Sequence, residues 1–165
     1  MWQDPIPVAL IMFLVSHSLE VRANEIRRWL RNQPSVALLV AAAYFEWTAS
    51  RAILALSRRP NADVRRDLVR VYGLDRYKDF WQAELKHLAG ATRLTEVVTD
   101  WHAVTEAFDA RHRLVHGRDR YTRKMAAPKV EALLTAVSEI HAYCLSHVVD
   151  INHRLPVRRR KQSAV

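Results

Sequence analysis

The chain of 165 residues contains only three glycines, Gly73, Gly90 and Gly117, and each follows an apolar run that is compatible with a helix. Glycine often ends a helix, because it adopts the left-handed backbone conformation without steric cost. No run of alternating β-branched and aromatic residues bounded by turn pairs such as Asn-Gly provides a source of strands. The sequence therefore predicts an all-α fold, a compact bundle of about five to six helices.

Apolar periodicity and helix-breaking residues divide the chain into helical segments. We expect helices over residues 8–31, 35–58, 62–72, 75–90, 95–117 and 128–151. Ser35, Asn61 and Thr95 are expected as N-caps, and Pro128 as the first residue of the last helix. Half of the residues are hydrophobic, so one core is expected. We expect a single helical domain over residues 1–154 and a basic C-terminal tail over 155–165.

The charge of the chain indicates a polyanionic partner. The formal net charge is +9 and the sequence pI is about 10.3. The excess is concentrated in two clusters, one around residues 111–124 and one at residues 158–161. Basic clusters bind nucleic acid by neutralising phosphates, although they also occur as solvated surface.

Two further features concern the compartment of the protein. Cys144 is the only cysteine, so no internal disulfide can form, and we expect it to be a small core residue. The apolar stretch over residues 7–15 lacks a basic segment before it and is too short to span a bilayer. We therefore expect a cytoplasmic protein without a membrane anchor.

The segment over residues 111–117 concentrates more chemistry than any other part of the chain. It holds a permanent cation at Arg111, imidazoles at His112 and His116, and a helix-ending glycine. Imidazole exchanges protons near neutral pH, and guanidinium matches the oxygens of a phosphate. The segment therefore predicts a site for phosphodiesters on the last turns of a helix.

Helical geometry decides which of these residues can act together. His112 and His116, four residues apart, share a face, whereas Arg111 and His116 are rotated by about 140° from each other. Their convergence requires a long reach by Arg111 or a second copy of the helix. A two-fold homodimer with this helix at its seam would bring two arginines and two histidine pairs to one cleft.

The order of Arg111, the polar His112 and then His116 resembles the signature of the HEPN superfamily. The resemblance implies a bundle of four or five helices, usually dimeric, with the signature on a late helix. Many members are metal-independent endoribonucleases of toxin–antitoxin modules, CRISPR effectors and anti-phage systems. Some antitoxin-paired members carry a tyrosine two residues after the histidine, where this chain has Arg118.

A second segment, residues 46–51, is similar to a pattern of some defence members in which Glu is followed by three residues, Lys and Arg. Glu46 and Arg51 match this pattern, and Ser50 stands where the lysine would be. The resemblance implies that Glu46 and Arg51 support the site.

By this resemblance the chain is expected to cleave RNA without a metal or cofactor. The 2′-hydroxyl attacks the adjacent phosphorus, the imidazoles of His112 and His116 transfer the protons, and Arg111 stabilises the developing charge. The implied setting is a toxin or anti-phage defence effector, with an antitoxin or regulatory protein as a further partner. The expected RNA-binding residues are Arg113, Arg118, Arg120, Arg123 and Lys124.

Each assignment has a structural alternative. Arg111 would pair with Glu106 or Asp109 on a solvated face, and His116 would be a helix C-cap. Glu46 would bind Arg51 or another cation, or orient the signature arginine. A zinc site at His112 and His116 would lack a marked third ligand. The alternative function is a non-catalytic helical module that binds nucleic acid or a protein.

Overall fold

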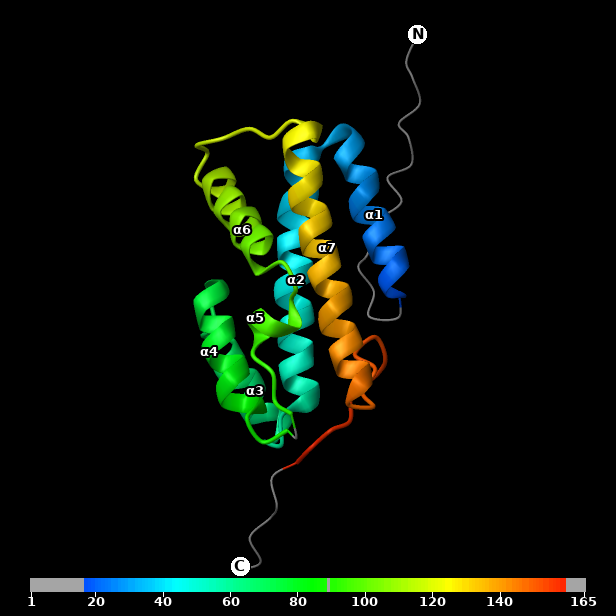
Figure 1. Cartoon of the computed structure of the whole chain (residues 1–165), viewed down its shortest axis with the longest axis vertical. Coiled ribbons are helices and arrows are strands. Elements are labelled where there is room, and N and C mark those ends of the chain that lie inside the picture. Colours follow the sequence, from blue (N-terminus) through cyan, green and yellow to red (C-terminus); the bar gives the residue numbers. More distant parts are fainter. Residues whose placement is uncertain (1–16, 89, 160–165) are drawn as a thin grey trace, which may run out of the picture.

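The computed structural model describes residues 17–88 and 90–159, and these residues form seven α-helices and no strand (Figure 1). The all-α prediction is therefore confirmed. The helices are α1 (Leu19–Asn32), α2 (Pro34–Leu56), α3 (Asn61–Leu68), α4 (Gly73–Leu85), α5 (Leu94–Val97), α6 (Trp101–Val115) and α7 (Arg123–Ser146). The apolar stretch before residue 17 lies outside the described residues.

The helix α2 forms the centre of the core. It packs along α7, with α1 and α6 as its other large neighbours (Figure 1). Alanines on α2 are fully buried and permit close helix approach, among them Ala37, Ala41, Ala49 and Ala52. By length and composition α2 could also cross a membrane, a property that it shares with the core helices of soluble proteins. Its uniform apolar character, read from the sequence, is explained by contacts on several sides.

The last helix begins earlier than predicted. Thr122 is the N-cap of α7, and its hydroxyl accepts a hydrogen bond from the N–H of Met125 at 3.4 Å. Pro128 therefore lies inside the helix instead of at its start. Because proline has no N–H, the carbonyl of Lys124 lacks its usual hydrogen bond within the helix. Lys124 is exposed, so water can bond this carbonyl instead. The cap at Thr122 decided the start of this helix.

The helix predicted over residues 95–117 is two helices. Val98 is extended, with φ −92° and ψ 110°, and ends α5. Asp100 then caps α6, and its side chain accepts from the N–H of Ala103 at 2.9 Å. Thr95 lies within α5 and is not a cap. The apolar periodicity continues across Asp100, so it did not indicate that this aspartate starts a new helix as its N-cap.

The segment after α7 folds back onto the bundle. Leu155 is buried, and the backbone N–H of Arg158 donates to Asn61 Oδ1 at 2.8 Å. Asn61, expected as an N-cap, is the first residue of α3, and its side-chain amide also donates to the carbonyl of Pro156 at 3.1 Å. Within the predicted tail Leu155 is thus buried and Arg158 is bonded to the start of α3, and residues 160–165 lie outside the described part.

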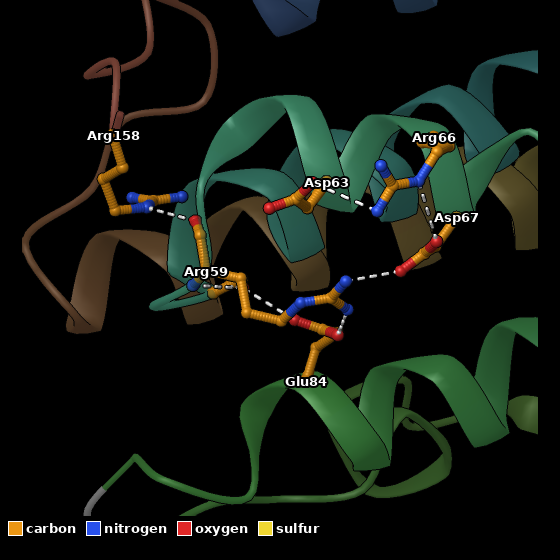
Figure 2. Close-up of polar contacts among 7 residues, drawn as sticks. Arg59, Asp63, Arg66, Asp67, Glu84 and Arg158 are labelled. Carbon is orange, nitrogen blue, oxygen red and sulfur yellow. Dashed lines mark hydrogen bonds and ion pairs between the residues drawn. The ribbon is translucent and has the colours of Figure 1, made fainter. Parts of the chain in front are cut away.

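A polar network joins α3 and α4 to the end of α2 (Figure 2). Glu84 of α4 is 8% exposed, and it accepts from the Ser57 hydroxyl at 2.7 Å and from Arg59 at 2.5 Å. The same guanidinium bonds Asp67 of α3 at 2.5 Å. A buried carboxylate without such donors would be costly, so this network fixes where α4 lies.

Candidate functional site

The local sequence of α6 places the motif at an exposed helix end. Phe108 anchors the helix in the core, with its ring centroid 5.5 Å from that of Phe45 on α2. The helix ends at Val115 and His116 is its C-cap. Gly117 follows with φ +65°, and the Arg118 N–H closes the end by donating to the carbonyl of Arg113 at 2.9 Å. The prediction that the motif forms the last turns of a helix is confirmed.

His112 and His116 form an exposed pair of imidazoles. Their ring centroids are 4.3 Å apart and their planes are inclined by 62°. Both side chains are exposed, as expected for residues four apart on an outer helix face. Two exposed imidazoles side by side can both contact a common ligand.

Arg111 lies on the inner side of α6. It follows Val104, Ala107 and Phe108 along the stripe of this helix that packs on α2, and it is half-buried. Within the described chain, no hydrogen bond or ion pair joins Arg111 to His112, His116, Glu106 or Asp109. The rotation of about 140° expected from the sequence therefore separates Arg111 from His116 within one copy of the chain.

Glu46 of α2 is the carboxylate that acts electrostatically on Arg111. Partial burial of Glu46 raises the pKa of its carboxyl group, and the positive charge of Arg111 opposes this rise. Of the alternatives for Glu46, the structure thus brings it near the signature arginine. The two side chains form no hydrogen bond or ion pair among the described residues, and Glu46 acts on Arg111 through its charge.

Arg51 points to a different part of the molecule. Its guanidinium donates to the carbonyls of Ile151 and His153 at 2.7 and 2.6 Å, and it lies over the ring of Trp47, 5.0 Å from the centroid. Desolvation and the charges of Arg22 and Arg65 lower the pKa of Arg51. Arg51 therefore holds the segment after α7 and is not in the same cluster as Glu46.

Ser50 and Tyr77 lie near Glu46, and sequence reasoning assigned neither of them a role in the site. The hydroxyls of Ser50 and Tyr77 are 3.1 Å apart and join α2 to α4. Burial raises the pKa of Tyr77, the hydrogen bond from Ser50 opposes this, and the charge of Glu46 adds to the rise. Ser50 is one turn after Glu46 on the same face of α2. Sequence patterns could not indicate Tyr77, because its partner Ser50 is 27 residues away in the chain.

The predicted RNA-binding residues divide into two groups. Arg113 is held by an ion pair with Asp119 at 2.9 Å and a hydrogen bond to the Tyr121 hydroxyl at 3.3 Å. The other four are exposed and form no ion pair with a described residue: Arg118, Arg120, Arg123 and Lys124. These four surround the connection between α6 and α7 and leave their charge available to a ligand.

A hollow of about 290 Å³ lies between α1 and α2, away from these residues. It is lined by Arg22, Val40, Ala43, Tyr44 and Trp47. Arg22 is 2% exposed and donates to Asn152 Oδ1 at 2.9 Å. Its guanidinium also lies over the Trp47 ring, 4.8 Å from the centroid. This buried arginine ties α1 to the segment after α7.

Cys144 is fully buried on α7, as predicted, and burial raises the pKa of its thiol to about 12. Among the described residues, no group of three or more His, Cys, Asp or Glu side chains is arranged to hold a metal ion. Comparisons of the chain with protein-family models, curated proteins and solved structures found no match.

Proposed function

We propose that this chain is a metal-independent endoribonuclease that acts as a homodimer. The observation that carries the proposal is the exposed pair of His112 and His116, whose ring centroids are 4.3 Å apart at the end of α6. A proton donor and a proton acceptor of the same type, side by side and open to a polymer, match the needs of phosphodiester transfer. The resemblance of the motif to the HEPN signature agrees with this assignment.

The reaction requires two proton transfers. One imidazole removes the proton of the RNA 2′-hydroxyl as the 2′-oxygen bonds to the adjacent phosphorus. The other gives a proton to the 5′-oxygen as the bond between phosphorus and that oxygen breaks. The products are a 2′,3′-cyclic phosphate and a 5′-hydroxyl, and DNA is inert because it lacks the nucleophile.

Arg111 stabilises the charge that develops on the non-bridging oxygens. Because Arg111 and the imidazoles diverge on one helix, a second copy of α6 supplies the missing partner in the homodimer. Glu46 orients the guanidinium of Arg111 from the neighbouring helix. The composite site therefore takes an arginine from one copy and the imidazole pair from the other.

The charge around the motif supports a polyanionic substrate. Arg118, Arg120, Arg123 and Lys124 are exposed and have no carboxylate partner among the described residues. Arg123 and Lys124 are the first two residues of α7, where the helix macrodipole is positive and further cations are unfavourable. Phosphates bound at this point relieve that repulsion. The resemblance further suggests a toxin or anti-phage defence effector, restrained by an antitoxin or regulatory protein.

The test is cleavage of a labelled single-stranded RNA in EDTA. We expect wild-type protein to leave a cyclic phosphate and to spare an otherwise identical strand with 2′-deoxyribose at the cut. His116→Ala should lose at least about 100-fold in rate, as expected for loss of general acid–base catalysis. The matched control is His102→Ala, since His102 is an exposed histidine on the first turn of α6 and should leave the rate unchanged.

Mixing two inactive variants tests the composite site. Arg111→Ala and His116→Ala are each expected to be inactive alone. Co-expressed, they form hybrid dimers in which one site keeps both residues, so part of the activity should return. Activity that requires a divalent ion, or hybrids that stay inactive although light scattering shows dimers, would contradict this mechanism.

One observation favours a non-catalytic nucleic-acid-binding module as the second candidate. Within the described chain the charge of Arg111 acts on Glu46, and no contact joins Arg111 to the imidazoles. In such a module Arg111 stabilises the bundle and the basic connection binds the ligand. RNA binding that is kept by His116→Ala, without cleavage by the wild type, would select this function.

A further inference from the structure

Tyr72 is an exposed aromatic side chain whose exposure the fold does not explain. It is 74% exposed, whereas every other described Trp, Tyr and Phe is buried or half-buried. Val69, three residues earlier, is 69% exposed, and Arg70 and Arg76 are exposed beside it in the sequence. We refer to Val69, Arg70, Tyr72 and Arg76 as the Tyr72 platform.

The backbone holds Tyr72 outward. Its conformation is extended, with φ −126° and ψ 131°, so its side chain points opposite to that of Val71, which is buried. Gly73 follows with φ +75° and begins α4, and Leu74 packs against the core. Val71 and Leu74 thus fix the chain on both sides of Tyr72. The Tyr72 hydroxyl forms no hydrogen bond with a described residue.

The platform carries available positive charge. Residues 65–78 contain five cations and two carboxylates, and both carboxylates have cationic partners. Asp67 bonds Arg59 at 2.5 Å and Asp75 bonds Lys78 at 2.6 Å. Arg70 and Arg76 form no ion pair within the described residues. An exposed ring with unpaired arginines two residues before it and four residues after it is complementary to a base flanked by phosphates.

The platform lies on the same side of α2 as the proposed site. Tyr77, on the second turn of α4, bonds Ser50 of α2 at 3.1 Å. Glu46 is one turn before Ser50 on the same face of α2, and it acts on Arg111 of α6. The beginning of α4, where Tyr72 is the N-cap, therefore lies toward the Glu46 and Arg111 side of α2. In Figure 1 one end of α4, which the course of the chain makes its first turn, approaches the end of α6 at which that helix begins, whereas the motif lies at the other end of α6.

We propose that the Tyr72 platform binds the single-stranded part of an RNA substrate and positions the strand for the site on α6. A base stacks on the Tyr72 ring, and Arg70 and Arg76 contact the phosphates on either side of it. Paired bases are already stacked inside a duplex and cannot occupy the ring, so the platform selects unpaired RNA. This inference rests on the proposed function for its purpose, but binding can be measured without cleavage.

The experiment measures the anisotropy of a fluorescent 12-nucleotide strand in which every ribose is 2′-O-methylated, so that cleavage cannot occur. Tyr72→Ala should weaken binding about 5- to 150-fold, the range of one base–aromatic stack. Tyr72→Trp should restore it. The control Val157→Ala removes another exposed apolar side chain, 64% exposed, and should change nothing. Binding of a blunt duplex should be the same for all variants.

The arginines are tested by salt dependence. Arg76→Ala and Arg70→Ala should each lower the slope of log Kd against log salt by about 0.7, the value for one phosphate contact on a single strand. The control is Arg154→Ala, which removes an exposed arginine in the segment after α7. Equal slopes for all three variants would contradict the assignment of Arg70 and Arg76 to phosphates.

The outcomes separate this inference from the proposed function. If the wild type binds through Tyr72 but never cleaves, the platform stands and the nuclease fails. If the wild type cleaves while Tyr72→Ala keeps full affinity and an unchanged KM, the platform is overturned and the nuclease stands. A change of oligomeric state in Tyr72→Ala would instead make this surface a contact between copies and would also overturn the inference. Thermal melts confirm that each variant is folded.

Discussion

The position of Arg158 makes a sharp prediction about the stability of the fold. Its guanidinium donates to the carbonyls of Leu54 and Ala55 in the last turn of α2, the latter at 3.1 Å. It also donates to the carbonyl of Arg59 at 3.2 Å, a contact drawn in Figure 2. The last carbonyls of a helix have no partner within the helix and carry the negative end of its dipole. Arg158 thus caps the central helix from a segment about 100 residues later.

The expected size of the effect follows from these bonds. Arg158→Met keeps the apolar stem and removes three hydrogen bonds from a charged donor. Water can replace part of each bond because the group is only partly buried, so we take about 1 kcal/mol for each, or about 2–3 kcal/mol in total. In a domain of this size that loss lowers the Tm by about 5–10 °C.

The measurement is urea and thermal unfolding followed by circular dichroism. The matched control is Arg159→Met, because Arg159 is adjacent, exposed and without a hydrogen bond to a described residue, and its loss should change the unfolding free energy by less than about 0.5 kcal/mol. If both variants lose the same amount, or neither loses anything, the capping argument is wrong and residues 155–159 behave as a tail.

Three further predictions follow from the described contacts. Desolvation would raise the pKa of Asp150, but hydrogen bonds from His141 and Asn152 and the charges of His141 and His153 hold it low. Its stabilisation is therefore present above about pH 4 and lost as the pH falls further, and Asp150→Asn should remove this acid dependence from urea titrations. Burial raises the pKa of Glu46, so the unfolding free energy of the wild type should decline as the pH rises above about 4.5, the pKa of an unburied glutamate. Glu46→Gln should remove this decline and should keep or increase the unfolding free energy at pH 7. A destabilised Gln variant would show that the charge interaction with Arg111 dominates. Gly117→Ala should cost about 1–2 kcal/mol in unfolding free energy, because φ is +65° and alanine is strained in this conformation. A Cβ would meet no atom within 4 Å, so the loss comes from the backbone alone. Gly117→Asn should cost less, and equal losses would point to another cause.

Much of the fold was readable because helix formation is a local property. The scarcity of glycine and the 3.6-residue periodicity indicated an all-α chain, and the uniform apolar run over residues 35–58 indicated the central helix. The errors are at helix ends, where a single cap outweighs periodicity. Asp100 divided one predicted helix into two, and Thr122 began α7 before Pro128.

The candidate site was readable only as a set of residue types on one helix. The i, i+4 spacing of His112 and His116 predicted a shared face, and their rings are in contact. The sequence indicated Glu46 as a charged residue in an apolar helix, but it did not indicate which cation of another helix lies near it. The sequence offered Arg51, five residues away. In the fold the charge of Arg111 acts on Glu46, and Arg51 donates to the carbonyls of Ile151 and His153.

Local sequence by itself determined that the chain is helical, that its basic motif ends a helix, and that two imidazoles share one face, because these features depend on residues within a turn or two of each other. Only the tertiary structure decided the partners of the charged groups. Arg158 reaches the end of α2, and Arg51 donates to the carbonyls of Ile151 and His153. Such pairings depend on which helices pack together, and burial makes an unpaired charge too costly to leave alone. The order of charges along the chain does not indicate which of them will pair.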